Sequence, residues 1–542
     1  MFEPFSKMSS QKWAHVGLLA GFCLLLYFVN LGQWDLWNPD EPRYAQVTRE
    51  MVTGGDWVLM HFNGNVYPDK PPLFFWLVAL ASLVWQGFGS FAVRFPAAVF
   101  GTLTVLLTYL LGRELYSPRA ALLSALILAT SVQFAYLSMR ANIDTTLAFF
   151  TTAALACFWM WHRGREGERH PWVILGFYVG MALATLTKGP VGFIFPALVC
   201  LTYLAIRKDW RAVRAMKLPS GLALLVAMVL VWYVPALARG GEDYFSATFF
   251  KHTIARYAEG WSHPQPVYYY LYNFPFNFLP WTFFLPAAIA HGITKEMAGK
   301  RQEFLFLLIW CIVIFLFFSF ARGKRGLYLI PLFPASALMV GKAWEELLEG
   351  QCRVGSKWIS FPTYGLTTLL VILGLITPLG VHRLFPSFLL YSLPVAFLLV
   401  TVGTACFLLY RSGRQGMLFA LLVGMMTAGI LYTSGVIFPL ANPYKSARFI
   451  SQEITRHMNP GDKLGIFGEG TGPYNFYTGI VPIVEFRAED EVLYFLRSPK
   501  RVLCLFTTRD FDHLRETGKI PPVRTIIHRQ VGSNSIVVVT NR

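Results

Sequence analysis

The sequence predicts a polytopic α-helical membrane protein that ends in a small, polar α/β domain. Of its 542 residues, 55% are hydrophobic and 14% are charged, and the mean hydropathy is +0.47. A soluble globular domain carries about 25% charged residues. Apolar runs recur through residues 1–440, whereas residues 441–542 are polar and contain short strand-like runs. We therefore predict a transmembrane domain over 1–440 and an α/β domain over 441–542.

The apolar runs define the predicted membrane spans. The first run, residues 13–30, is long enough to cross a bilayer and is followed by no small-residue cleavage site, so we interpret it as an uncleaved helix. Together with the later runs it makes about thirteen spans. Residues 71–87 are an ambiguous extra segment that fits a position along the membrane interface. The later spans lie near residues 90–112, 119–138, 143–162, 172–187, 189–206, 219–238, 272–292, 303–320, 326–343, 361–380, 388–410 and 416–438.

Basic residues in the short loops predict the orientation. They recur in every second loop, and the positive-inside rule places these loops, with the N-terminus, in the cytoplasm. The remaining loops then face outward, including the first loop at 31–90, and an odd number of spans also places residues 441–542 outside. The basic loops carry Arg113, Arg119, Arg163, Arg165, Arg169, Arg207, Lys208, Arg211, Arg214, Lys217, Lys295, Lys300, Arg301, Lys342, Arg353, Lys357, Arg411 and Arg414.

The C-terminal region alternates strand-like and helical patterns, which is typical of a small α/β domain. The glycine-rich segment 468–472 follows a predicted strand, but it lacks the full dinucleotide fingerprint and lies outside the cytoplasm. We therefore expect no dinucleotide site there. The predicted strands are 463–467, 480–486, 502–506 and 535–539, and the predicted helices are 446–458 and 489–496.

Two other classes of function are not expected. The net charge of +17 is distributed over the cytoplasmic loops, which indicates topology and contact with anionic lipids rather than a nucleic-acid partner. The seven cysteines are scattered, five of them within apolar spans, and form no CxxC pair. A disulfide framework or a zinc module is therefore not predicted.

The first external loop concentrates charge at the membrane boundary, where it is costly to hold. Asp40, Glu41 and Arg43 begin a short amphipathic helix, so Asp40 is either a helix cap or a functional carboxylate. Three prolines stiffen the segment around Asp69 and Lys70. This segment is either a rigid turn with Lys70 extended toward the interface or a positioned acid–base pair.

Further charged residues fall on the same predicted external side. Asp144 lies near the start of an apolar helix and is either a helix cap or a functional group, and Lys188 joins two spans with almost no loop between them. Basic residues outside the membrane oppose the orientation bias, and a bound phosphate is the simplest explanation. The other members of this set are Lys251, His252 and Arg256, for which a solvated loop helix is the alternative, and the cluster Arg322, Lys324, Arg325 and Tyr328.

Several segments together resemble the bacterial lipid A aminoarabinose transferases and, more loosely, the protein O-mannosyltransferases. The first loop carries the most specific part of the resemblance, with DEPRY at 40–44, REM at 49–51, GDW at 55–57 and DKPP at 69–72. The resemblance continues in order through Asp144, TKGP at 187–190, Lys251 to Arg256, PQPVYY at 264–269, PW at 280–281 and YLIP at 328–331. It covers essentially the whole membrane part.

The resemblance implies a GT-C fold and transfer of a sugar from a polyprenyl-phosphate carrier at the outer face of the bacterial inner membrane. It implies that Asp40 is the catalytic or donor-orienting carboxylate, and we add Glu41 and Asp144 as catalytic candidates. Asp69 stands where related enzymes have a glutamate that can help to hold a divalent metal, here with His252; the shorter side chain weakens this hypothesis. The predicted contacts of the carrier phosphate are Arg43, Lys70, Lys188, Arg256, Arg322, Lys324, Arg325 and Tyr328.

The predicted reaction is transfer of 4-amino-4-deoxy-L-arabinose from undecaprenyl phosphate to lipid A or another acceptor at the periplasmic face. External cations would stabilise the phosphate that leaves, and a lipid-linked donor requires no nucleotide outside the cell. One alternative is a protein O-mannosyltransferase-like enzyme. Another is a flippase or transporter for a lipid-linked sugar, but its charges should lie near the bilayer midplane and its halves should repeat.

Overall fold

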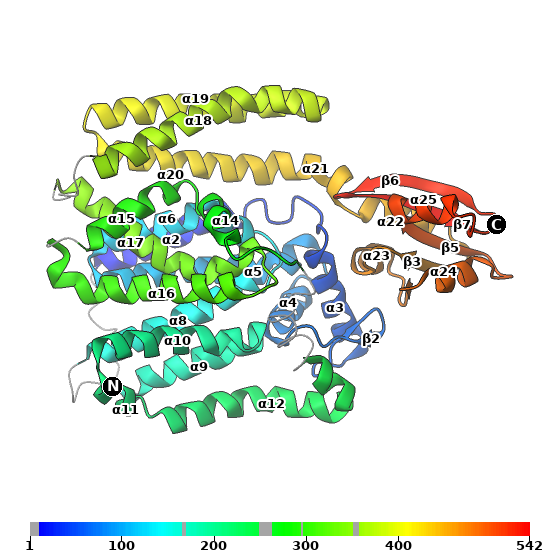
Figure 1. The fold of residues 1–542 in the computed structure, drawn as a ribbon, viewed down its shortest axis with the longest axis horizontal. Coiled ribbons are helices and arrows are strands. Elements are labelled where there is room, and N and C mark those ends of the chain that lie inside the picture. Colours follow the sequence, from blue (N-terminus) through cyan, green and yellow to red (C-terminus); the bar gives the residue numbers. More distant parts are fainter. Residues whose placement is uncertain (1–9, 165–169, 249–262, 294–295, 351–356) are drawn as a thin grey trace.

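The computed structural model describes residues 10–164, 170–248, 263–293, 296–350 and 357–542 (Figure 1). Most of the chain forms a bundle of helices, and the C-terminal strands and helices lie at one end of that bundle. Between these two parts lie helix α3 (Asp40–Gly54) and the hairpin of β1 (His61–Phe62) and β2 (Asn65–Val66). The first loop of the sequence therefore occupies the junction.

Within the described residues, eight helices are long and apolar enough to cross a membrane. The bent pair α6 (Pro118–Thr130) and α7 (Val132–Ser138) adds a ninth if it forms one span. The chain is thus a polytopic helical membrane protein, as predicted. The eight spans run through α5 (Ser90–Leu115), α9 (Pro171–Lys188), α12 (Leu218–Phe245), α16 (Arg301–Phe320), α17 (Phe333–Leu348), α18 (Lys357–Leu384), α19 (Leu389–Arg411) and α20 (Gln415–Tyr432).

The other predicted spans are helical but do not meet the same criterion of length and apolarity. α10 (Val191–Arg207) is too short, and the segment at 272–292 is divided among short helices, with Pro280, which has no backbone N–H, at the break. α2 (Ser10–Tyr27) and α8 (Asp144–Arg163) are long enough but carry polar side chains. The count of about thirteen spans therefore stays a prediction.

Short elements connect the long helices. The extra segment predicted at 71–87 is the short apolar helix α4 (Leu73–Val84). The others are α11 (Trp210–Ala215), α14 (Tyr269–Asn277), η2 (Trp281–Phe284), α15 (Leu285–Gly292), η3 (Glu296–Lys300), η4 (Gly326–Leu332), η5 (Pro386–Phe388), η6 (Thr433–Ile437) and α21 (Phe438–Lys445).

The C-terminal region forms a mixed sheet with helices on both faces. Its elements are α22 (Arg448–His457), β3 (Lys463–Phe467), α23 (Gly472–Thr478), β4 (Val484–Phe486), α24 (Glu489–Leu496), β5 (Val502–Thr507), α25 (Thr508–Glu516), β6 (Arg524–Val531) and β7 (Asn534–Thr540). The strand order is β4-β3-β5-β7-β6, in which β4, β3 and β5 are parallel and the last two pairings are antiparallel. Alternate residues of the strands pack against α22 on one face and against α24 and α25 on the other.

The predicted strands and helices of this region are all present. The prediction omits the short helices α23 and α25 and the strand β6. In β6 most side chains are polar or exposed, and only Ile527 is a buried apolar residue in its middle. The apolar alternation that identifies a strand in sequence is therefore weak there.

Helix α3 has residues at both ends that favour the start and the end of a helix. Asp40 and Glu41 lie in the first turn, where the helix dipole favours carboxylates, and Gly55 ends the helix with a φ of 72°. The amphipathic face expected from the sequence is buried against α4, which positions the first turn of α3 at the edge of the helix bundle. The apolar cluster between the two helices includes Tyr44, Val47, Met51, Phe74 and Phe75.

Glu41, a predicted catalytic residue, is enclosed by protein and 1% exposed. Its carboxylate accepts hydrogen bonds from Arg94 of α5 at 2.7 and 3.0 Å and from Arg140 at 3.1 Å. The backbone N–H groups of Trp37 and Ala141 each donate to it at 3.0 Å. Because the protein itself uses both carboxylate oxygens, Glu41 holds the first loop in place. The assignment of Glu41 to catalysis is therefore corrected.

Arg94 was not among the predicted site residues, yet it organises this network. It is fully buried, and it also donates to the backbone carbonyl groups of Leu31, Trp34 and Asp35 at 3.1, 2.8 and 2.7 Å. An arginine within an apolar span is itself a signal of a specific partner, and this signal could have identified Arg94 in the sequence. Burial acts to raise the pKa of Glu41, but the charges of Arg94 and Arg140 lower it to about 2.

Glu41→Gln is expected to destabilise the protein, because it leaves Arg94 and Arg140 without their counter-charge. Removing one partner of a buried ion pair costs about 3–5 kcal/mol. The matched control is Glu349→Gln, which breaks an exposed pair with Arg119 and should cost about 0–1 kcal/mol. Thermal unfolding of the full chain in detergent, followed by fluorescence, measures both changes.

The effect of Glu41→Gln should depend on pH in one direction. Because the folded pKa of about 2 lies below the ordinary value of 4.5, the stabilisation by Glu41 is complete above pH 4.5 and is lost as the pH falls toward 2. The melting temperatures of wild type and variant should therefore differ by a constant amount near neutral pH and converge in acid. Equal melting temperatures at pH 7 would contradict this role.

Candidate active site

A cavity of about 670 Å³ lies where the first loop meets α8, α9, α10, α12, α16 and η4. Its lining divides into a charged part and a larger apolar part, which suits an amphiphilic ligand. The apolar part includes Leu186, Val191, Ile194, Trp232, Phe317 and Phe318. The charged and polar part includes the predicted site residues Asp40, Arg43, Asp69, Lys70, Asp144, Lys188, Arg325 and Tyr328.

Asp40 projects from the first turn of α3 into this cavity. One carboxylate oxygen accepts from Arg43 at 2.7 Å and the other from Arg325 at 2.7 Å. Burial would raise the pKa of Asp40, but Arg325, Arg43 and Arg140 outweigh burial and hold it below its ordinary value. Asp40 is therefore an ionised acceptor at neutral pH. Pro39, and not Asp40, is the N-cap residue of α3, and both carboxylate oxygens of Asp40 contact arginine side chains of the cavity.

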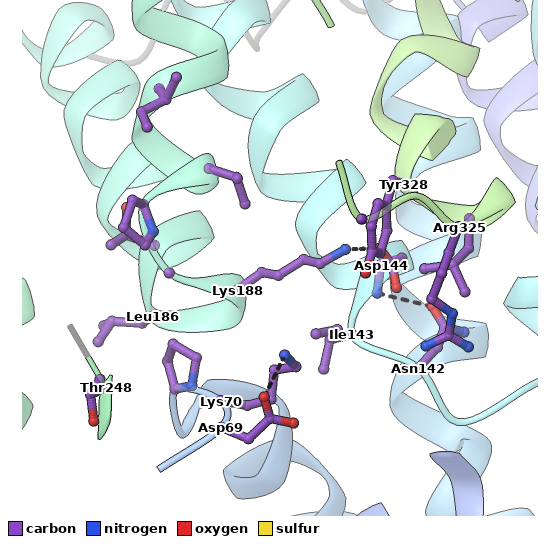
Figure 2. Close-up of a pocket in the computed structure, with 18 of the residues that line it drawn as sticks. Asp69, Lys70, Asn142, Ile143, Asp144, Leu186, Lys188, Thr248, Arg325 and Tyr328 are labelled. Atoms are coloured by element: carbon purple, nitrogen blue, oxygen red, sulfur yellow. Dashed lines mark hydrogen bonds and ion pairs between the residues drawn. The ribbon is translucent and has the colours of Figure 1, made fainter. Parts of the chain in front are cut away.

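Asp144 and Lys188 form an ion pair across the cavity (Figure 2). Lys188 reaches from the end of α9 to the Asp144 carboxylate, and its ammonium nitrogen lies 4.4 Å from the centre of the Tyr328 ring. Asn142, not Asp144, caps α8, because its side-chain oxygen accepts from the backbone N–H of Asp144 at 3.0 Å. The Asp144 side chain is thereby free of a capping role and faces Lys188.

Close packing of α9 against α10 positions Lys188. Gly189 turns the chain with a φ of 80°, and Gly192 lies against the backbone of α9. A Cβ atom at residue 192 would approach the carbonyl carbon of Ala184 to 2.2 Å. The short connection predicted from the sequence therefore directs the lysine toward the cavity rather than toward solvent.

Asp69 and Lys70 lie together in the cavity lining (Figure 2). The Lys70 ammonium contacts Asp69 at 3.2 Å, and the Tyr67 hydroxyl donates to the other carboxylate oxygen at 3.2 Å. The side chains of Lys70 and Asp69 are 11% and 14% exposed. This geometry favours the positioned pair over a lysine extended along the membrane interface.

The predicted metal ligands Asp69 and His252 are not both within the described residues, so the metal site stays a prediction. Each of Asp40, Asp69 and Asp144 is paired with a cation, and no group of three or more metal-ligating side chains occurs in the described part of the chain. His252, the second predicted ligand, and Arg256, a predicted phosphate contact, lie outside the described residues, as does Lys251.

The predicted cation cluster after α16 is divided by the fold. Arg325 lines the cavity, whereas Arg322 is exposed and is not part of its lining. Lys324 is buried beneath the loop, where its ammonium donates to the backbone carbonyl groups of Ala321 and Gln265, the latter at 2.8 Å. The assignments of Arg322 and Lys324 to a phosphate site are therefore corrected, since neither residue lines the cavity and Lys324 stabilises the loop.

Comparison with known proteins identifies similar sugar transferases. The family model of dolichyl-phosphate-mannose-protein mannosyltransferases matches residues 14–241. An undecaprenyl phosphate-α-4-amino-4-deoxy-L-arabinose arabinosyl transferase of Pseudomonas aeruginosa (strain LESB58) is 35% identical over 333 residues, which are 60% of this chain and 58% of that protein. A second, from Pseudomonas fluorescens (strain Pf0-1), is 33% identical over 404 residues, which are 72% of this chain and 70% of that protein.

Solved structures share the fold over a greater length. ArnT from Cupriavidus metallidurans, bound to undecaprenyl phosphate, superposes with a TM-score of 0.81 at 23% identity over 98% of this chain and 99% of that one. The oligosaccharyltransferase AglB from Archaeoglobus fulgidus superposes with a TM-score of 0.55 at 14% identity over 91% of this chain and 69% of that one. These similarities establish the expected GT-C fold. The match to the Pseudomonas fluorescens protein shows that this chain belongs to the family of undecaprenyl phosphate-α-4-amino-4-deoxy-L-arabinose arabinosyl transferases.

Proposed function

We propose that this protein transfers 4-amino-4-deoxy-L-arabinose from undecaprenyl phosphate to lipid A at the periplasmic face of the inner membrane. The observation that carries the proposal is the cavity, in which paired charges adjoin an apolar compartment. A polyprenyl phosphate-linked sugar has the matching polarity, since a charged phosphate joins a hydrocarbon chain to a polar sugar. The family relationship supports the specific sugar and carrier.

The cavity offers cations to the phosphate of the donor. Lys70, Lys188 and Arg325 line it, and each is paired with a carboxylate in the structure. When the glycosidic bond breaks, its electron pair remains on the carrier phosphate, whose charge increases. Cations that are already oriented stabilise that charge without rearranging solvent. The ring of Tyr328, beside the Lys188 ammonium, limits the positions open to that lysine.

Asp40 is assigned to orientation of the reacting groups. A phosphate acceptor on lipid A is already ionised, so one of its oxygens can attack the anomeric carbon as the carrier phosphate leaves, and no proton has to be removed. The lowered pKa of Asp40 makes it a weak general base but a permanent anion, which suits the charge that develops on the sugar ring. The donor phosphate would compete with Asp40 for Arg325.

The orientation and the domain division belong to the same proposal. The charged part of the cavity adjoins the first loop, which is predicted to face the periplasm. The basic loops that are predicted to face the cytoplasm lie in other segments of the sequence. Residues 1–440, with about thirteen spans, would carry the reaction, and residues 441–542 would lie in the periplasm.

Wild-type protein, produced in cells that make the donor, is expected to add a pentosamine-sized mass to lipid A. Asp40→Asn should lower this product by about 100-fold or more, because the amide carries no charge to orient the reacting groups. Asp512→Asn, at an exposed position on α25, is the matched control and should behave as wild type. Mass spectrometry of lipid A, with immunoblots of the membrane fraction, provides the measurement. Unmodified lipid A beside abundant wild-type protein would refute the proposal, and a modified protein or other glycan would identify a different acceptor.

Arg325→Ala and Arg322→Ala test the division of the cation cluster. Arg325→Ala is expected to lower kcat/KM by roughly 100-fold, since it removes a charge that faces both Asp40 and the proposed phosphate position. Arg322→Ala, at an exposed residue outside the cavity, should stay within about twofold of wild type. Transfer assays with purified donor in detergent measure both. Equal losses would restore Arg322 to the site.

A further inference from the structure

The C-terminal sheet meets the first loop at the edge where doubly wound sheets bind ligands. Strand β3 lies between its parallel neighbours β4 and β5, so the chain leaves β3 at a topological switch point. In this protein the chain that leaves β3 continues into α23, which packs beside α3 (Figure 1). The segment next to this edge is therefore the helix that carries Asp40 and Arg43.

Gly472, the first residue of α23, lies against the backbone of Arg43. A Cβ atom at residue 472 would stand 3.1 Å from the Cβ of Arg43, 3.3 Å from its Cα and 3.4 Å from Cζ of Phe62. The guanidinium of the same arginine donates to Asp40 at 2.7 Å. The α/β region therefore contacts the first turn of α3 through a glycine. Because the contact involves backbone atoms on that side, it cannot be relieved by a change of side-chain rotamer at residue 472.

The hairpin after α3 provides a second connection. The buried side chain of Asn63 donates to the carbonyl group of Ile483 at 2.8 Å, and its oxygen accepts from Asn475 at 2.8 Å and from the backbone N–H of Ile483 at 2.7 Å. Glu50 of α3 accepts from the backbone N–H groups of Asn63 and Gly64 at 2.8 and 3.0 Å. The C-terminal region is thus linked to α3 through the hairpin.

Arg49 provides a third connection near the other end of α3. Its guanidinium donates to the carbonyl group of Phe476 at 2.9 Å and lies 4.3 Å from the centre of the Phe476 ring. Tyr477, the next residue, donates to the carbonyl group of Leu36 just before α3, at 2.8 Å. The α/β region therefore contacts α3 at Arg43 and at Arg49. It also contacts the segment that leads into α3, at Leu36.

We propose that the C-terminal α/β region sets the position of α3 for transfer, with Gly472 as a positioning residue that acts through Arg43 on Asp40. The inference rests on the proposed function for its kinetic test. A displacement of Arg43 by a few tenths of an ångström moves the guanidinium that orients Asp40. Displacements of about 1 Å at a distance from the chemistry can lower a rate by about 100-fold.

The experiment compares Gly472→Ala with Gly470→Ala in the full chain. Gly472→Ala is expected to lower kcat by about 10-fold and to leave KM for the donor within about twofold, because the displacement is passed through Arg43 to Asp40 and not to Lys70 or Lys188, which are proposed to contact the donor phosphate. Gly470 lies in the loop just before α23, and a Cβ atom at that residue would meet no other atom within 4 Å, so Gly470→Ala should match wild type. Wild-type kcat in both variants would overturn the inference. A loss of kcat of the same size in both variants would overturn it as well.

A second measurement does not depend on activity. Hydrogen–deuterium exchange of the purified full chain should be faster in the α3 peptide of Gly472→Ala than of wild type, and unchanged in α25. If wild type shows no transfer, the proposed function fails, and the exchange data alone decide whether Gly472 positions α3. Should Gly472→Ala not accumulate, Arg49→Gln removes the contact with Phe476 without added volume and is expected to raise exchange in α3 and lower kcat. Unchanged exchange in α3 for that variant would overturn the inference.

Discussion

Glu41 is buried between Arg94 and Arg140, and the position of Asp40 depends on this ion cluster. Neighbouring residues of a helix point in directions about 100° apart, so one carboxylate can face the protein interior while the other faces the cavity. The inward carboxylate holds the start of α3 against α5, because an unpaired charge at this depth would be costly. The outward carboxylate therefore projects from a rigid support, and Arg43 and Arg325 orient it there.

The carboxylates of the cavity are already paired with cations before any substrate arrives. Asp40, Asp69 and Asp144 are each paired with a cation that also lines the cavity or borders it. Such pairs hold lysine and arginine side chains in place where solvent is scarce, so that they are already oriented when an anionic ligand enters. An incoming phosphate can exchange with a carboxylate for the same cation. Under the proposed function, the charged residues would form a preformed site rather than a set of mobile side chains.

Several site residues could be identified from sequence because their location is unusual. Lys188 stands between two nearly continuous spans, and Asp69 and Lys70 are enclosed by prolines. Charges with so little access to solvent need a partner, and the structure places these three side chains in one cavity. The same reasoning could not separate Arg325 from Arg322 and Lys324, because neighbouring residues of one loop differ only in the direction of their side chains. It also missed the pairing of Arg94 with Glu41, because the two residues lie far apart in the sequence.

Composition and periodicity are local properties, and they were enough to predict the class of the protein, the helical character of its spans and the order of most C-terminal elements. Which charges share a cavity, and that α23 lies against α3, became evident only in the folded chain. Contacts such as Gly472 with Arg43 or Asn63 with Asn475 join residues that are hundreds of positions apart. Local pattern says which face of a helix is apolar, but packing and hydrogen bonding across the whole chain select the partner that the face meets.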